Sequence, residues 1–120
     1  MQHNMRLFES SFNSMKSGKK TVEVRLNDEK RRKISIGDSI IFTKVPKSNE
    51  TLTVEVVELR EFTTFKEMYE RIPAKDFDTV GDPIDLMVQQ TYEIYSANQE
   101  NEWGTLAITV KLLEADTNSL

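Results

Sequence analysis

The feature that most constrains the fold is the alternation of apolar and polar residues in the segment 21–26, Thr-Val-Glu-Val-Arg-Leu. Successive side chains of a β-strand point to opposite faces, so the three apolar residues are predicted to face a core while Glu23 and Arg25 share the other face. An exposed ion pair contributes only about 0 to 1 kcal/mol to stability. A charged pair held on a rigid strand therefore favours contact with a polar ligand.

Short elements are predicted along the rest of the chain. Alternating or β-branched residues predict further strands over 39–44, 51–59 and 104–113, and in the last of these the even-numbered residues 106–112 are expected to share one face. Apolar residues at helical spacing predict helices over about 7–15, 65–72 and 82–95. Strands grouped around an inserted helical segment predict an α+β fold, a small β-barrel flanked by short α-helices.

The length of 120 residues predicts one domain, assigned to residues 1–113, with 114–120 as a flexible C-terminal tail. The chain has no cysteine, and its single histidine, His3, lies at an N-terminus that is expected to fray. Disulfides, thiolate metal sites, and Ser-His or Cys-His catalysis are thereby excluded. The residue spacing indicates neither a metal nor a cofactor. No apolar stretch approaches the roughly 20 residues of a membrane span, which predicts a cytoplasmic protein without membrane association.

Charge is distributed unevenly between the two parts of the chain. Residues 1–48 contain 11 Lys or Arg against 5 Asp or Glu, whereas residues 49–120 contain 5 against 15. Basic clusters supply most of the affinity for nucleic-acid backbones, so a phosphate-bearing ligand is expected to meet the first part. Alternatively, the two oppositely charged parts fold against each other, and the basic run 30–33 is a solvated turn. The net charge of −4 favours a small or local ligand over long RNA.

The residues Gly18, Lys20, Glu23 and Arg25, spaced G-x-K-x-x-E-x-R and followed by a basic run and Gly37-Asp38, resemble the signature of the ASCH (activating signal cointegrator homology) domain family. The resemblance covers nearly the whole chain, although only its first third is specific. It implies a small β-barrel of the PUA-like type and a function that involves RNA or nucleosides.

Some members of this family hydrolyse 4-N-acetylcytidine with a lysine, a threonine three residues later and a downstream glutamate. Lys20 matches the lysine, but Glu23 stands at the threonine position, and no downstream glutamate can be aligned. The resemblance therefore carries a catalytic role over to Lys20 only. The residues are also compatible with a hydrolase mechanism in which Glu23 activates a water molecule while Lys20 and Arg25 stabilise developing negative charge.

The predicted ligand-binding residues are Lys20, Glu23, Arg25, Tyr95 and Glu100. An arbitrary lysine is usually a snorkelling surface residue, and Glu23 with Arg25 is equally consistent with a structural bridge. Tyr95 and Glu100 are included because they fall in the C-terminal segment that resembles the family.

Neighbouring residues are predicted to have structural roles instead. Asp38 follows a glycine and precedes an apolar strand, a pattern typical of a turn in which the carboxylate binds nearby backbone amides. Tyr92 and Trp103 offer stacking surfaces for a base, but aromatic residues at such spacing more often belong to a core.

Three functions are compatible with these residues. The first is the binding of RNA or of a modified nucleoside in a cleft lined by Lys20, Glu23 and Arg25, which needs only the matching residues. The second is a small hydrolase, of amidohydrolase or ribonuclease type, in which Lys20 and Glu23 are catalytic. The third is a regulatory domain that binds a protein partner through its acidic second part.

Overall fold

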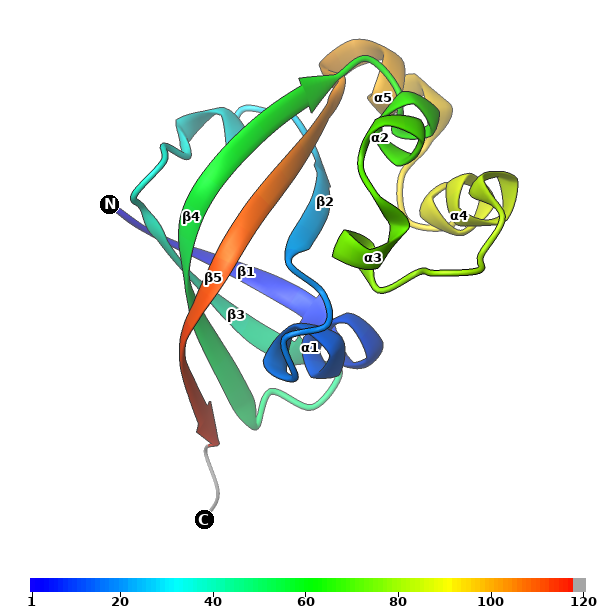
Figure 1. Ribbon diagram of the computed structural model, residues 1–120. Coiled ribbons are helices and arrows are strands. Elements are labelled where there is room, and N and C mark those ends of the chain that lie inside the picture. Colours follow the sequence, from blue (N-terminus) through cyan, green and yellow to red (C-terminus); the bar gives the residue numbers. More distant parts are fainter. Residues whose placement is uncertain (118–120) are drawn as a thin grey trace.

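The computed structural model describes residues 1–117 and shows a curved five-stranded sheet with short helices at its open side (Figure 1). The strands are β1 (Gln2–Phe8), β2 (Val22–Leu26), β3 (Ser39–Val45), β4 (Glu50–Phe62) and β5 (Thr105–Thr117). The helices are α1 (Glu9–Lys16), α2 (Phe65–Arg71), α3 (Ala74–Phe77), α4 (Ile84–Thr91) and α5 (Ala97–Trp103), with a 3-10 turn, η1, at Arg31–Lys33.

The sheet is mixed, and its strand order is β1-β3-β4-β5-β2. β1 runs parallel to β3, whereas the other neighbouring strands pair in antiparallel fashion. The long strands β4 and β5 curve, and their register shifts after Thr53 and after Val56, as β-bulges do where a sheet bends. The result is a half-barrel whose two edge strands, β1 and β2, flank an open seam.

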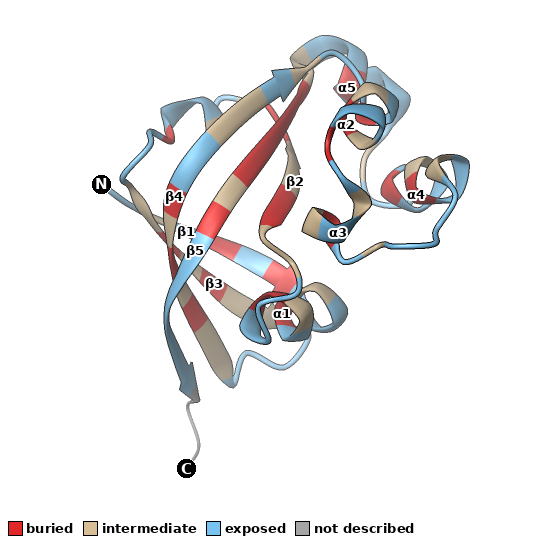
Figure 2. Cartoon of the chain, viewed as in Figure 1, coloured by how far each residue is buried: buried red, intermediate tan, exposed pale blue. Residues whose placement is uncertain are grey.

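Two hydrophobic cores lie on opposite faces of the sheet. Figure 2 marks in red the buried residues along the strands and on the helices. The barrel core combines apolar side chains of β1, β3, β4 and β5 with Phe12 and Met15 of α1, which closes one end. The second core packs Val22 of β2 and Ala107 of β5 against α2, α3 and α4. The predicted alternation of the last strand is confirmed at residues 106–110, because Leu106, Ile108 and Val110 enter the barrel core while Ala107 enters the second.

The start of the chain differs from the sequence prediction. A helix was predicted from about Leu7, but Leu7 and Phe8 end the strand β1, and α1 begins only at Glu9. His3 is likewise not frayed, because its Nε2 lies 2.8 Å from Asp38 Oδ2 in a partly buried contact. Parallel pairing of β1 with β3 is a non-local interaction, and the apolar spacing of residues 7–15 does not reveal it.

The helix predicted over residues 82–95 is shorter in the structure, because only α4, Ile84–Thr91, lies in this region and a separate helix follows it. α4 ends at Thr91, and α5 begins after Ser96, whose side chain caps it in a capping box with Gln99. The helix α5 ends at Trp103, and the next residue, Gly104, has a backbone conformation (φ 72°, ψ −171°) that is accessible almost only to glycine. The irregular turn of residues 92–96 places Tyr95 beside the open seam.

The C-terminal tail was predicted to begin at Glu114, but β5 continues to Thr117. Residues 114–117 pair with residues 50–53 of β4, so this part is an ordered ribbon. Residues 118–120 of the predicted tail lie outside the described residues. In the described part of the chain, every helix is too short or too polar to cross a membrane.

Candidate functional site

The candidate site is a cavity of about 620 Å³ at the open seam of the half-barrel. Its walls come from the ends of β1 and β3, from β2 and η1, and from α1, α2, α4 and the turn before α5. We call it the cationic cavity, because its described lining includes four basic residues and one acidic residue. These are Arg6, Lys20, Arg25, Arg31 and Glu23. All five belong to the basic first part of the chain.

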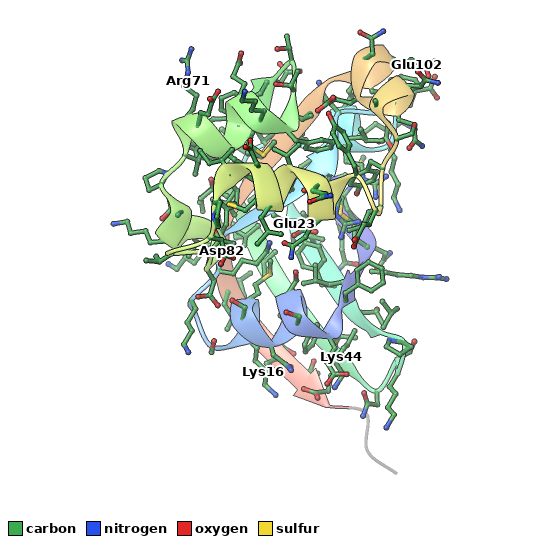
Figure 3. All side chains as sticks on the ribbon, turned by 90° about the vertical axis from the view of Figure 1, so that its right-hand side faces the viewer. Lys16, Glu23, Lys44, Arg71, Asp82 and Glu102 are labelled. Carbon is green, nitrogen blue, oxygen red and sulfur yellow. The ribbon has the colours of Figure 1, made fainter. Side chains whose placement is uncertain are left out.

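Lys20, Glu23 and Arg25 form one connected cluster in this cavity. Lys20 Nζ lies 3.3 Å from Glu23 Oε1, and Arg25 Nε donates to Glu23 Oε2 over 2.7 Å. Their side chains are only 10 %, 7 % and 12 % exposed, respectively. Lys20 is therefore not a snorkelling surface lysine. Glu23, at the middle of the cluster, is labelled near the centre of the view in Figure 3.

The electrostatics of the cluster follow from this enclosure. Burial alone raises the pKa of Glu23, but the charges of Lys20 and Arg25 and their hydrogen bonds outweigh burial, so the pKa is lowered. Burial alone lowers the pKa of Arg25, yet Glu23 and Tyr95 more than compensate, and this pKa is raised. The lowered pKa keeps Glu23 a carboxylate at neutral pH, so one anionic group lies between the two basic side chains of the cluster.

Arg25 also bridges the seam between the two edge strands. Its Nη2 donates to the carbonyl oxygen of Arg6 in β1, and its guanidinium lies 6.0 Å from the centre of the Phe42 ring in the barrel core. An edge strand has unpaired backbone groups, and a planar guanidinium with five donors suits this position better than an ammonium does. Arg25 therefore serves both the fold and the cavity.

Aromatic side chains complete the lining. Tyr95 is stacked on Phe65, with 5.7 Å between ring centres and 17° between planes, and burial is the main cause that raises its pKa. The hydroxyl groups of Tyr69 and Thr91 are hydrogen-bonded to each other, with 2.6 Å between their oxygens. Phe8 lines the cavity from the end of β1 and is exposed. Flat apolar surfaces beside cations are the combination that binds nucleotide bases and phosphates.

Glu100, the fifth predicted ligand-binding residue, is not among the lining residues. Its carboxylate is buried beneath the helices, where it accepts the Phe65 N–H at 2.8 Å and the Tyr92 hydroxyl at 2.6 Å. The hydrogen bond to Glu100 is the main cause that raises the pKa of Tyr92. Glu100 thus joins α5 to the start of α2. The ligand contact that the sequence predicted for Glu100 is not available, because its carboxylate does not line the cavity.

Replacing Glu100 by Ala is expected to lower the free energy of unfolding by about 1 to 3 kcal/mol, because a buried N–H and a hydroxyl lose their acceptor. Denaturant unfolding measures the loss. Glu100→Gln keeps one acceptor oxygen and should lose less. Equal stability of Glu100→Ala and the wild type would contradict the assigned role.

The residues predicted to have structural roles are found outside the cavity. Asp38 accepts the Ser35 N–H at 2.9 Å, which confirms the turn, and it also contacts His3 and the N-terminal ammonium. The hydrogen bond to His3 is the largest cause that lowers the pKa of Asp38 to about 2, and the other hydrogen bonds add to it. The indole of Trp103 faces the guanidinium of Arg32 at 5.3 Å.

Sequence reasoning missed several lining residues. Arg6 lies in the strand that was mistaken for the approach to a helix, and Arg31 belongs to the basic run that was interpreted as a possible solvated turn. Tyr69 lies within the helix predicted over residues 65–72, and its hydroxyl reaches Thr91. The excess of basic residues in the first 48 positions was the available signal for the two arginines. Among the described residues, no group of three or more His, Asp or Glu side chains is arranged to hold a metal ion.

The fold and its cavity define a small α+β half-barrel protein of the PUA-like type. The profile of the ASCH domain matches residues 5–114, and the chain belongs to the ASCH domain family. No curated protein matches the chain.

Solved structures agree with this assignment. The crystal structure of the hypothetical protein PH0355 is 34 % identical, with a TM-score of 0.84 over 94 % of this chain and 100 % of that one. The solution structure of the protein PF0455 from Pyrococcus furiosus is 31 % identical, with a TM-score of 0.73 over 95 % and 99 %. A mutant of the ASCH protein from Zymomonas mobilis is 12 % identical, with a TM-score of 0.67 over 96 % and 72 %, and it shows the fold alone.

Proposed function

We propose that this protein binds the nucleotide of an RNA, or a modified nucleotide, in the cationic cavity. The observation that carries the proposal is the excess of guanidinium and ammonium groups beside aromatic rings in one cavity. Its volume of about 620 Å³ lies in the usual range for small-ligand sites. Arginine forks bind phosphate in two-pronged geometry, and a base can stack on the exposed faces of the lining rings.

Binding is proposed ahead of catalysis because of the state of Glu23. A general base must take up a proton, whereas both oxygens of this carboxylate already face cations, at 3.3 Å and 2.7 Å, and its pKa is lowered. Glu23 is thus better suited to hold Lys20 and Arg25 in position than to activate water.

The binding proposal is tested on Arg6, which lines the cavity from β1 and is not part of the ion cluster. Calorimetric titration with a short single-stranded RNA and with nucleoside monophosphates should show that Arg6→Ala weakens binding about tenfold, the effect of losing one charge-assisted hydrogen bond. Binding should also weaken as salt rises. Arg71→Ala is the matched control, because Arg71 is exposed on α2 and distant from Glu23 (Figure 3). Equal losses in the two arginine variants, or no binding by the wild type, would contradict the proposal.

A hydrolase is the second candidate, because Lys20 lies in the cavity at the position that matches the catalytic lysine of the family's amidohydrolases. Chromatography of 4-N-acetylcytidine incubated with the wild type and with Lys20→Ala separates the two functions. A binding module releases no cytidine in either case. Product from the wild type alone would establish the amidohydrolase and place catalysis ahead of binding.

A further inference from the structure

A second cavity, of about 340 Å³, adjoins the cationic cavity. The two share six lining residues, which makes them contiguous: Ser11, Lys20, Val24, Tyr69, Thr91 and Ile94. The second is lined by hydroxyl groups of α1 and of the segment after α3, and we call it the hydroxyl cavity. Lys20 stands at the boundary between the two.

The hydroxyl cavity has the opposite charge from the cationic cavity. Its lining carboxylates are Asp78 and Asp82, both in the connection from α3 to α4. The Ser14 hydroxyl of α1 donates to Asp78 over 2.5 Å and thereby joins the two walls. Asp82 lies at the end of α4 near α3 in Figure 3. The cleft as a whole thus changes from cationic at the seam to anionic beside α4.

A ligand that fits both parts must itself be asymmetric in charge. We propose that the cleft takes a nucleotide that is phosphorylated at one end only, with its phosphate in the cationic cavity and its unphosphorylated end in the hydroxyl cavity. Ribose hydroxyls and base amino groups donate hydrogen bonds, and the carboxylates and hydroxyl oxygens accept them. This inference rests on the proposed nucleotide binding, and it assigns the orientation and the class of ligand.

The same asymmetry disfavours an internal nucleotide of an RNA chain. An internal nucleotide carries a phosphate on each side, so its second phosphate would approach Asp78 and Asp82. Like charges at about 4 Å repel by about 1 kcal/mol even in water, which corresponds to about fivefold in affinity. A free mononucleotide and the terminal nucleotide of an RNA share the required chemistry.

The test compares a nucleoside 5′-monophosphate, the 3′-monophosphate and the 3′,5′-bisphosphate by calorimetric titration. The wild type should bind the bisphosphate no more tightly than the better monophosphate. In the double variant Asp78→Asn, Asp82→Asn, the affinity for the bisphosphate relative to that monophosphate should rise about fivefold. Asparagine tolerates the left-handed backbone of Asp78 (φ 60°) and can still accept from Ser14. In 1 M salt the discrimination should largely vanish.

The matched control is Glu70→Gln, Glu102→Gln, which removes the same charge from exposed positions on α2 and α5. This variant should leave the ratio of affinities unchanged. A wild type that prefers the bisphosphate, or a ratio that the Asp78 and Asp82 variant does not change, overturns this inference while nucleotide binding stands. Failure of the wild type to bind any of the three compounds overturns both. A short RNA with a free 3′ end, added as a fourth ligand, separates the two sources: tighter binding than the mononucleotides identifies a chain terminus, and weaker binding a free nucleotide.

Discussion

Replacing Glu23 by Ala is expected to lower the free energy of unfolding by about 3 to 5 kcal/mol, the usual loss when one member of a buried ion cluster is removed. Lys20 and Arg25 would be left as neighbouring cations in a nearly closed site, with side chains only 10 % and 12 % exposed. Denaturant unfolding at pH 7 measures the loss. Glu58→Ala is the control, because Glu58 forms a single 3.5 Å pair with Arg60 and its side chain is 53 % exposed. That variant should lose less than about 1 kcal/mol.

The stability that Glu23 confers should depend on pH in a defined direction. Its pKa is lowered in the folded protein from an ordinary value of 4.5, so its contribution is present above that value and is lost as the pH falls through the folded-state pKa. The stability difference between the wild type and Glu23→Gln should therefore shrink below about pH 4.5. The carboxylates of Asp38 and Glu50, whose pKa values are about 2, also contribute stability that depends on pH. These contributions are the same in the wild type and in Glu23→Gln, so they cancel in the difference. A difference that stays constant from pH 7 to pH 3 would show that Glu23 acts through packing and not through charge.

Replacing Phe42 by Ala is expected to cost about 3 to 5 kcal/mol, because a fully buried ring leaves a void that the surrounding strands cannot fill. Phe42 lies opposite Met5 of β1 and Leu52 of β4, at the middle of the barrel core. Its ring also lies under the Arg25 guanidinium at 6.0 Å. Thermal and denaturant unfolding should both report the loss.

Phe42→Leu is the matched control, since it retains most of the apolar volume and should lose clearly less stability. Because it removes the ring beneath Arg25, it also separates the support of the site from the stability of the core. If Phe42→Ala and Phe42→Leu lower the free energy of unfolding equally, the loss of the aromatic ring is the main cause. The void left by alanine would then contribute little.

The site owes its rigidity to its position in the sheet. Glu23 and Arg25 are carried by β2, which is paired with β5 along its whole length, and the opposite wall is β1, paired with β3. Side chains on strands are held more firmly than side chains on loops. The more irregular wall, which contains Tyr95 and the α3 to α4 connection, faces them across the cleft and contributes the aromatic and acidic groups.

The sequence by itself determined some of the local elements and the central cluster. The alternation of residues 21–26 predicted β2, with Glu23 and Arg25 on one face. The spacing from Lys20 predicted that its side chain lies close to these two. Both relations are set by residues that are near one another in the chain. The same holds for the short helix before Pro73 and for the apolar face of β5.

Only the tertiary structure decided what surrounds that cluster. The parallel pairing of β1 with β3 brings Arg6 to the seam, and the break between α4 and α5 brings Tyr95 to it while Glu100 turns into the interior. These placements depend on contacts between residues far apart in sequence, and local periodicity contains no information about them. Likewise, Asp78 and Asp82 are unremarkable turn residues in the sequence, and they become part of the cleft because the α3 to α4 connection packs beside α1.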